Sequence, residues 1–230
     1  YTDVIYLDKG ALAKIISELN KKKNSFILIF HNSDYTVDSQ FVPLTQLKHC
    51  KKLFAQNTIM IHEKIQYLPI GIANSKWKHG NKQLLNEIIS KNIDKENKIF
   101  FNFSRNTNKR KRNLCYEKLK LKLKFEEKFD SQTDYLESLA RCKFCIVPEG
   151  NGYDTHRLWE CLYLKTIPIC LSNTFSEIIS KDFPLHRISN WEGIEPNTIV
   201  DTYSEYVCKI EIEKLDFLYW KDIINTALCT

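Results

Sequence analysis

The sequence predicts an α/β fold in which parallel strands alternate with helices. Short apolar runs alternate along the chain with stretches in which apolar residues recur at helical spacing. Of the 230 residues, 43% are hydrophobic and 27% are charged, which provides enough apolar surface for a packed core. Strands that alternate with helices are typical of parallel sheets joined by right-handed crossovers.

A polar stretch divides this alternation into two similar parts. Residues 91–98 read KNIDKENK and contain a single apolar residue. Such charged stretches are typical of boundaries between domains. We therefore expect one α/β domain over residues 1–95 and a second over 96–230, with the last helix able to cross back to the first.

In the first part, the clearest element is a strand at 25–30. Its sequence, SFILIF, is a nearly uninterrupted apolar run, which is typical of a parallel strand covered on both faces. A helix is predicted before it at 10–20, because the apolar residues there share one face. The other elements expected here are strands at 4–7, 58–61 and 65–70 and helices at 44–56 and 81–92.

The second part repeats the alternation. A strand at 98–103 (KIFFNF) leads into a very basic helix at 109–124. A strand at 143–147 leads through a loop with two glycines into a helix at 154–164. The other elements expected here are strands at 166–171 and 186–188 and helices at 135–141, 174–180 and 214–228.

Charge and cysteine content narrow the class of protein. A formal net charge of +6 and a pI of about 8.8 suit an anionic ligand, whereas nucleic-acid-binding domains usually carry a larger and more clustered excess. The 8 cysteines are scattered through apolar stretches, which indicates reduced thiols and a cytoplasmic location. No apolar run approaches the ~20 residues of a membrane-spanning helix. The chain begins at Tyr1, so a removed leader or anchor would instead indicate a Golgi-type lumen.

Residues 142–171 carry most of the functional information. A strand ends in a loop with two glycines, where the backbone can approach a ligand closely. Asp154 is predicted to cap the next helix, whose free N–H groups suit a phosphate. Arg157 in the first turn adds a planar cation, and Glu160 shares its face. Alternatively, Arg157 and Glu160 simply pair with each other. The segment contains neither a dinucleotide fingerprint nor a P-loop.

This segment resembles the carboxyl-terminal signature of exostosin-like glycosyltransferases. The resemblance is close over 144–169, where a Pro-x-Gly loop leads to a helix with Arg and Glu and then to an Ile-Pro strand. Residues 30–34 and 69–81 are similar to short members encoded by large DNA viruses of algae and protists. Glu160-Cys161 replaces the usual Glu-Ala, and Lys165 replaces a usual small residue. The resemblance implies a GT-B fold, with two Rossmann-like domains and an active site in the cleft between them.

The resemblance also implies roles for the second half. Arg157 would neutralise the diphosphate of a nucleotide sugar, and Glu160 would accept hydrogen bonds from ribose hydroxyls. The loop of Glu149, Gly150, Asn151 and Gly152 would lie near the sugar or diphosphate. A second group of polar residues follows the strand at 98–103 in an equivalent position; we expect Arg105 to contact phosphate there, and the group comprises Ser104, Arg105, Asn106, Thr107 and Arg110. The alternative is that this basic stretch is a solvated helix face.

Candidate catalytic residues lie in the first half. Asp34 follows the strand at 25–30 and is the predicted base that takes the proton of an acceptor hydroxyl, with His31 as an alternative or orienting partner. Alternatively, Asp34 caps a turn. His79 is a further candidate. Acceptor contacts are expected from Trp77, which can stack on a sugar, and from Asn32 and Ser33. Trp191 is expected to line the cleft, and Cys142 and Cys145 are expected to be structural.

The predicted function is glycosyl transfer without a metal or other cofactor. No Asp-x-Asp pair is present, so cations and a helix end must offset the charge of the leaving diphosphate. The donor is expected to be a UDP-sugar, with UDP-xylose as the first choice, and the acceptor a glycan or glycoprotein hydroxyl. Inversion is favoured because a candidate base is present. The alternatives are a nucleic-acid-binding protein that uses residues 109–124 and a catalytically inactive relative that binds nucleotide sugars.

Overall fold

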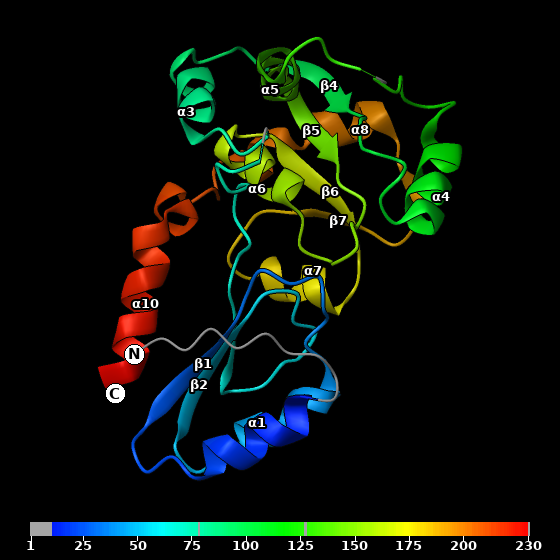
Figure 1. The fold of residues 1–230 in the computed structure, drawn as a ribbon. Coiled ribbons are helices and arrows are strands. Elements are labelled where there is room, and N and C mark those ends of the chain that lie inside the picture. Colours follow the sequence, from blue (N-terminus) through cyan, green and yellow to red (C-terminus); the bar gives the residue numbers. More distant parts are fainter. Residues whose placement is uncertain (1–10, 78, 127, 230) are drawn as a thin grey trace.

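The computed structural model describes residues 11–77, 79–126 and 128–229, and it confirms the α/β fold. Two parallel sheets stand one above the other (Figure 1). The first has three strands in the order β1-β2-β3, and the second has four in the order β4-β5-β6-β7. The strand predicted at 4–7 lies outside the described residues.

The first sheet comprises β1 (Phe26–Phe30), β2 (Cys50–Ala55) and β3 (Ile65–Tyr67). Leu53 faces one apolar core and the adjacent Phe54 faces another, because successive side chains of a strand point to opposite faces. The core around Leu53 is covered by α1 (Ala11–Asn20). The short helices η1 (Ser39–Phe41) and α2 (Val42–Thr45) connect β1 to β2.

The prediction of a helix at 44–56 is wrong. Helix α2 ends at Thr45, and residues 50–55 form the central strand of the first sheet. Leu53, Phe54 and Ala55 are fully buried in succession, which is the pattern of a strand covered on both faces, and a short apolar run does not distinguish this from helix. The strand predicted at 58–61 is reduced to one bridge between Val37 and Thr58.

The second sheet comprises β4 (Glu96–Phe100), β5 (Cys142–Ile146), β6 (Ile167–Leu171) and β7 (His186–Ile188). Strands β5 and β6 are central and almost entirely buried. Leu158, Cys161 and Leu162 of the helix between β5 and β6 are buried in the core. The helices and turns between and after these strands are α4 (Lys109–Leu119), α5 (Gln132–Arg141), α6 (His156–Tyr163), α7 (Thr174–Ile179), η2 (Trp191–Gly193), α8 (Pro196–Asp201), α9 (Tyr203–Val207) and η3 (Ile212–Leu215).

Two helices connect the halves. Helix α3 (Lys82–Ser90) follows the first sheet in sequence but packs on α5 of the second, where Lys91 pairs with Glu137 at 2.6 Å. Helix α10 (Phe217–Cys229) returns beside β1 and β2, and Lys51 Nζ donates to the carbonyl of Leu228 at 3.1 Å (Figure 1). One apolar core joins Phe54 of the first sheet to residues of the second.

All eight cysteines are free thiols, and six of them are buried. Cys142 and Cys145 are among the buried ones, on β5, where they pack in the core. Within the described residues, every helix is too short or too polar to cross a membrane.

Candidate functional site

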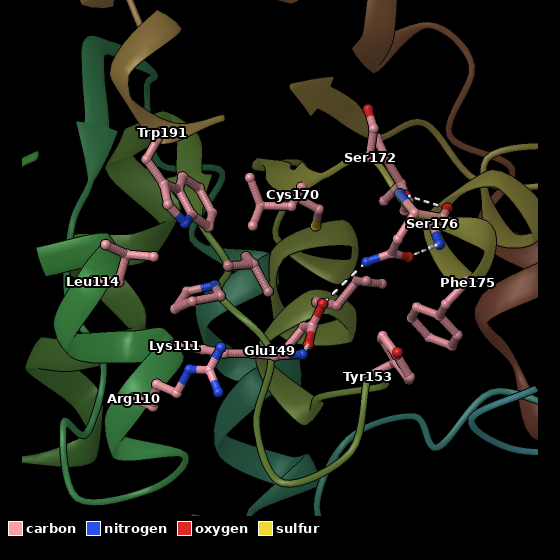
Figure 2. Close-up of a pocket in the computed structure, with 16 residues that line it drawn as sticks. Arg110, Lys111, Leu114, Glu149, Tyr153, Cys170, Ser172, Phe175, Ser176 and Trp191 are labelled. Carbon is pink, nitrogen blue, oxygen red and sulfur yellow. Dashed lines mark hydrogen bonds and ion pairs between the residues drawn. The ribbon is translucent and has the colours of Figure 1, made fainter. Parts of the chain in front are cut away.

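A cavity of about 340 Å³ lies at the carboxyl edge of the second sheet. It is formed between α4 and α7, above the ends of β5 and β6 (Figure 2). In open parallel sheets, ligands bind outside the carboxyl ends of the strands, so this is the expected place for a site. The residues that line it are Arg110, Lys111, Leu114, Val147, Pro148, Glu149, Tyr153, Leu158, Cys170, Leu171, Ser172, Asn173, Phe175, Ser176, Leu185 and Trp191.

Glu149 lines this cavity beside Lys111 (Figure 2). One carboxylate oxygen accepts a hydrogen bond from Asn173 Nδ2 at 3.0 Å, and the other forms an ion pair with Lys111. Asn173 is itself fixed, because it caps α7 in a reciprocal pair of bonds with Ser176. The sequence analysis missed Asn173, although a Ser-Asn-Thr run directly after an apolar strand is a recognisable helix start.

Two cations lie on the α4 side of the cavity. Arg110 and Lys111 occupy the first turn of α4, and the Lys111 ammonium lies 5.3 Å from the ring centre of Tyr153. Asn108, the residue before the helix, donates to the carbonyl of Gly150 at 2.6 Å. The helix start and the loop that carries Glu149 are therefore tied together, and the positive end of α4 points toward the loop.

Most of the remaining cavity wall is apolar or aromatic. Trp191 is 4% exposed and lines this cavity, while its predicted place in the cleft between the two domains stays a prediction. Phe175 and Tyr153 stack on each other with centroids 5.6 Å apart. Cys170 also faces the cavity, but burial raises the pKa of its thiol, which keeps it protonated and unreactive. An anionic group near α4 and a flat ring near the aromatic side chains would both be accommodated.

Asp154 does not cap α6, contrary to the prediction. Thr155 is the capping residue, and the Asp154 carboxylate is turned into the core. It accepts hydrogen bonds from Tyr67 OH at 2.6 Å, from the amide of Ile70 at 2.8 Å and from Trp159 Nε1 at 2.7 Å. Burial raises its pKa to about 6. Asp154 thus ties α6 to the strand and loop that end the first half.

Asn57 connects the loops of the two halves, and the sequence analysis missed it. Its Nδ2 donates to the carbonyl of Ser33 at 2.8 Å, and its Oδ1 accepts from the amide of Asp154 at 2.7 Å. Gly152 approaches this side chain so closely that a Cβ would lie 2.7 Å from it. Gly152 therefore allows a close contact with Asn57, and its predicted place near the sugar or diphosphate stays a prediction. Asn57 is fully buried, and because burial of a polar residue cannot be read from the sequence, no sequence signal pointed to it.

Arg157 and Glu160 lie beside the cavity rather than in its wall. Arg157 donates to the carbonyl of Asn102 at 2.6 Å and to its Oδ1 at 3.2 Å, and the guanidinium lies 4.7 Å from the ring centre of Tyr135. Its Nε is 3.6 Å from Glu160 Oε2, and Glu160 also accepts from the hydroxyl of Tyr135. These contacts match the pairing alternative, and the predicted roles in nucleotide binding stay predictions.

Of the polar residues predicted to bind phosphate after the strand at 98–103, most lie away from the cavity. Arg105 turns away, with its guanidinium 4.1 Å from the ring centre of Tyr116 and its Nε donating to Asn113 at 2.9 Å. Of this group only Arg110 lines the cavity. Ser104 contributes a carbonyl to Arg112 at 2.9 Å, whereas Asn106 is exposed and Thr107 half-buried.

Most lysines of the basic stretch 109–124 form ion pairs with glutamates. Lys118 pairs with Glu192 at 2.7 Å, and Lys122 pairs with Glu195 at 3.0 Å. Lys122 also donates to the carbonyls of residues 192 and 194 at 2.8 and 2.9 Å. These contacts reduce the free positive charge that the nucleic-acid alternative requires.

The loops of the first half lie against this edge. Asp34 and Asn32 are exposed in the loop after β1, and His31 Nε2 donates to the carbonyl of Pro69 at 3.0 Å. Trp77 is 56% exposed and stacks on His79 with centroids 6.3 Å apart. His79 in turn lies 6.3 Å from His156, measured between ring centres. The predicted acceptor-side residues are thus present on the surface near the start of α6.

Within the part of the chain that the structure describes, no group of three or more His, Cys, Asp or Glu side chains is arranged to hold a metal ion. The cationic groups of the cavity are Arg110 and Lys111.

Comparisons with known proteins agree with this architecture. A search of curated protein sequences finds no match. The family model for the exostosin GT47 domain, a glycosyltransferase family with the GT-B fold, matches residues 15–180. This match includes both sheets up to β6, the loop of Glu149 and helix α7. The chain therefore belongs to the exostosin GT47 family of glycosyltransferases.

Proposed function

We propose that this glycosyltransferase moves a sugar from a UDP-sugar to a hydroxyl of a glycan, without a metal ion and with inversion at the anomeric carbon. The observation that carries the proposal is the pair of cations, Arg110 and Lys111, at the start of α4 beside an aromatic-lined cavity. Cations and a helix start are suited to a diphosphate, and aromatic walls to a base.

Binding of the donor would use the two sides of the cavity differently. The diphosphate would lie toward Arg110 and Lys111, and the uracil toward Tyr153, Phe175 and Trp191. The family resemblance instead predicts that Arg157 neutralises the diphosphate. For that, Arg157 would have to exchange its bonds to Asn102 for bonds to phosphate.

The proposed chemistry requires one base and a stabilised leaving group. Asp34 would accept the proton of the acceptor hydroxyl as its oxygen bonds to the anomeric carbon. The bond from that carbon to the diphosphate breaks on the opposite face, and UDP leaves with the bonding pair. Asp34 belongs to the loop whose Ser33 carbonyl is held by Asn57, and Asn57 also holds the amide of Asp154. This link supports the placement of the base near the donor loop.

The proposal also names a donor and a class of acceptor. UDP-xylose is the proposed donor, and the acceptor is a sugar hydroxyl presented by a glycan or glycoprotein. Trp77 provides an exposed aromatic face against which an acceptor sugar can stack.

Calorimetric titration with UDP tests the donor site. We expect saturable binding that persists in EDTA. The absence of UDP binding would contradict the proposal, and loss of binding in EDTA would contradict its metal-free part.

The base is tested separately by Asp34→Asn. This variant should bind UDP normally and transfer sugar about 10²- to 10⁴-fold more slowly, since that is the usual contribution of a general base. Unchanged turnover would place the base elsewhere, with His79 as the next candidate.

A further inference from the structure

The carboxylate of Glu149 is a fixed negative charge inside the cavity. Its side chain is 17% exposed, and one oxygen is held by Asn173 at 3.0 Å. The backbone is held as well, because Arg112 Nε donates to the carbonyl of Glu149 at 3.0 Å and Asn108 donates to the next carbonyl at 2.6 Å. The position of the carboxylate is therefore set by the fold and does not depend on its ion pair with Lys111.

Lys111 is the adjustable member of that ion pair. Its side chain is 51% exposed and has four rotatable carbons, whereas Asn173 is locked by its capping bonds to Ser176. A phosphate that enters the cavity can draw the Lys111 ammonium toward itself. The second oxygen of Glu149 then loses its cation and faces the ligand.

An uncompensated carboxylate in an apolar cavity discriminates strongly between ligands. Sugar hydroxyls can donate hydrogen bonds to it, whereas a second carboxylate is repelled, and the apolar walls weaken the screening of that repulsion. Resting on the function proposed above, we infer that Glu149 makes the site selective for nucleotide sugars with an uncharged sugar and excludes those with a uronic acid.

The test compares two donors that differ only at C6. UDP-glucose and UDP-glucuronate are titrated calorimetrically into the wild-type chain and into Glu149→Gln, which keeps the size of the side chain but removes its charge. We expect the wild type to bind UDP-glucose at least tenfold more tightly than UDP-glucuronate. In Glu149→Gln the ratio should fall below about threefold, mainly because UDP-glucuronate binds more tightly.

Glu177→Gln provides the matched control, since it removes the same charge from an exposed position on α7. It should leave the ratio unchanged, and thermal unfolding checks that both variants are folded. Equal affinities of the wild type for the two donors would overturn the inference even if Glu149→Gln failed to fold. An unchanged ratio in folded Glu149→Gln would also overturn it.

UDP alone separates this inference from the proposed function. Binding of UDP without discrimination between the two donors contradicts only the role of Glu149. Failure to bind UDP at all contradicts the proposed donor site, and the selectivity inference with it.

Discussion

Two cation–carboxylate pairs flank the same loop, and they differ in how exposed their side chains are to solvent. Lys111 pairs with Glu149 in the cavity, and their side chains are 51% and 17% exposed. Arg157 pairs with Glu160 beside the cavity, and theirs are 21% and 10% exposed. The chemistry of the two pairs is similar, so their surroundings decide which pair is available to a ligand.

The guanidinium of Arg157 already makes two hydrogen bonds to Asn102, although its buried Nε has no hydrogen-bond partner among the described residues. Asn102 accepts two bonds from the guanidinium, and Tyr135 both stacks on it and donates to Glu160. A ligand that recruits the Arg157 N–H groups bonded to Asn102 must break those bonds, whereas one that recruits Lys111 displaces an ion pair whose lysine is half exposed. From this comparison we expect Arg157 to contribute mainly to stability and Lys111 mainly to ligand binding.

The largest effect is expected for Arg157→Met. The variant leaves Glu160 and the acceptors of Asn102 without their cation, so the free energy of unfolding should fall by about 3 kcal/mol, the usual cost of breaking an enclosed pair. Lys111→Met should lower it by less than about 1 kcal/mol, because Lys111 is half exposed and Asn173 still holds the carboxylate of Glu149. Urea denaturation measures both. If both variants lost the same free energy of unfolding, the Arg157 pair would not be the more stabilising of the two.

A third carboxylate, Asp154, provides a further comparison, because it is 4% exposed and forms no ion pair with a cation of the described residues. Its pKa rises from 3.8 to about 6 on folding because burial disfavours the charged form. The folded chain therefore holds a proton more tightly than the unfolded chain, and the stabilising contribution is present below pH 4 and lost as the pH rises through 6.

This pH dependence is measured against Asp154→Asn. The free energy of unfolding of the wild type, relative to that of the variant, should fall by up to about 3 kcal/mol between pH 4 and pH 7. The subtraction removes the contributions of other titrating groups. A difference that stays constant with pH, or grows as the pH rises, would contradict the raised pKa.

A smaller effect is expected for UDP binding by Lys111→Met. Loss of one exposed cation from the phosphate side should weaken UDP binding by about tenfold. Calorimetry on this variant and on folded Arg157→Met gives the direct comparison. A greater loss of affinity in Arg157→Met would support the role that the family resemblance predicts for Arg157.

The smallest effect is expected from salt. Raising NaCl from about 0.1 M to 1 M shortens the screening length from about 10 Å to about 3 Å. UDP affinity should fall a few-fold, while the destabilisation caused by Arg157→Met should change by less than about 0.5 kcal/mol. A destabilisation that disappears in high salt would show that the Arg157 pair is exposed to solvent in solution.

Local signals sufficed for most elements. Strand β5 and the loop and helix after it were recognisable because an apolar run, two glycines and a Pro-x-Gly signature fall together. The sequence pattern did not predict β2, because the short apolar run there has no periodicity that separates helix from strand. Neighbouring strands β1 and β3, which are separate in sequence, decide the conformation there.

In the candidate site, too, some features could be read from the sequence and others depended on the folded chain. The sequence alone determined the α/β class, the family signature and the loop in which Glu149 lies, because each depends on residues close together in the chain. Only the tertiary structure decided which charges face the cavity, that Asp154 turns inward and that Asn57 joins the two halves. Burial and long-range hydrogen bonds set those outcomes, and both arise from residues that meet only when the chain is folded.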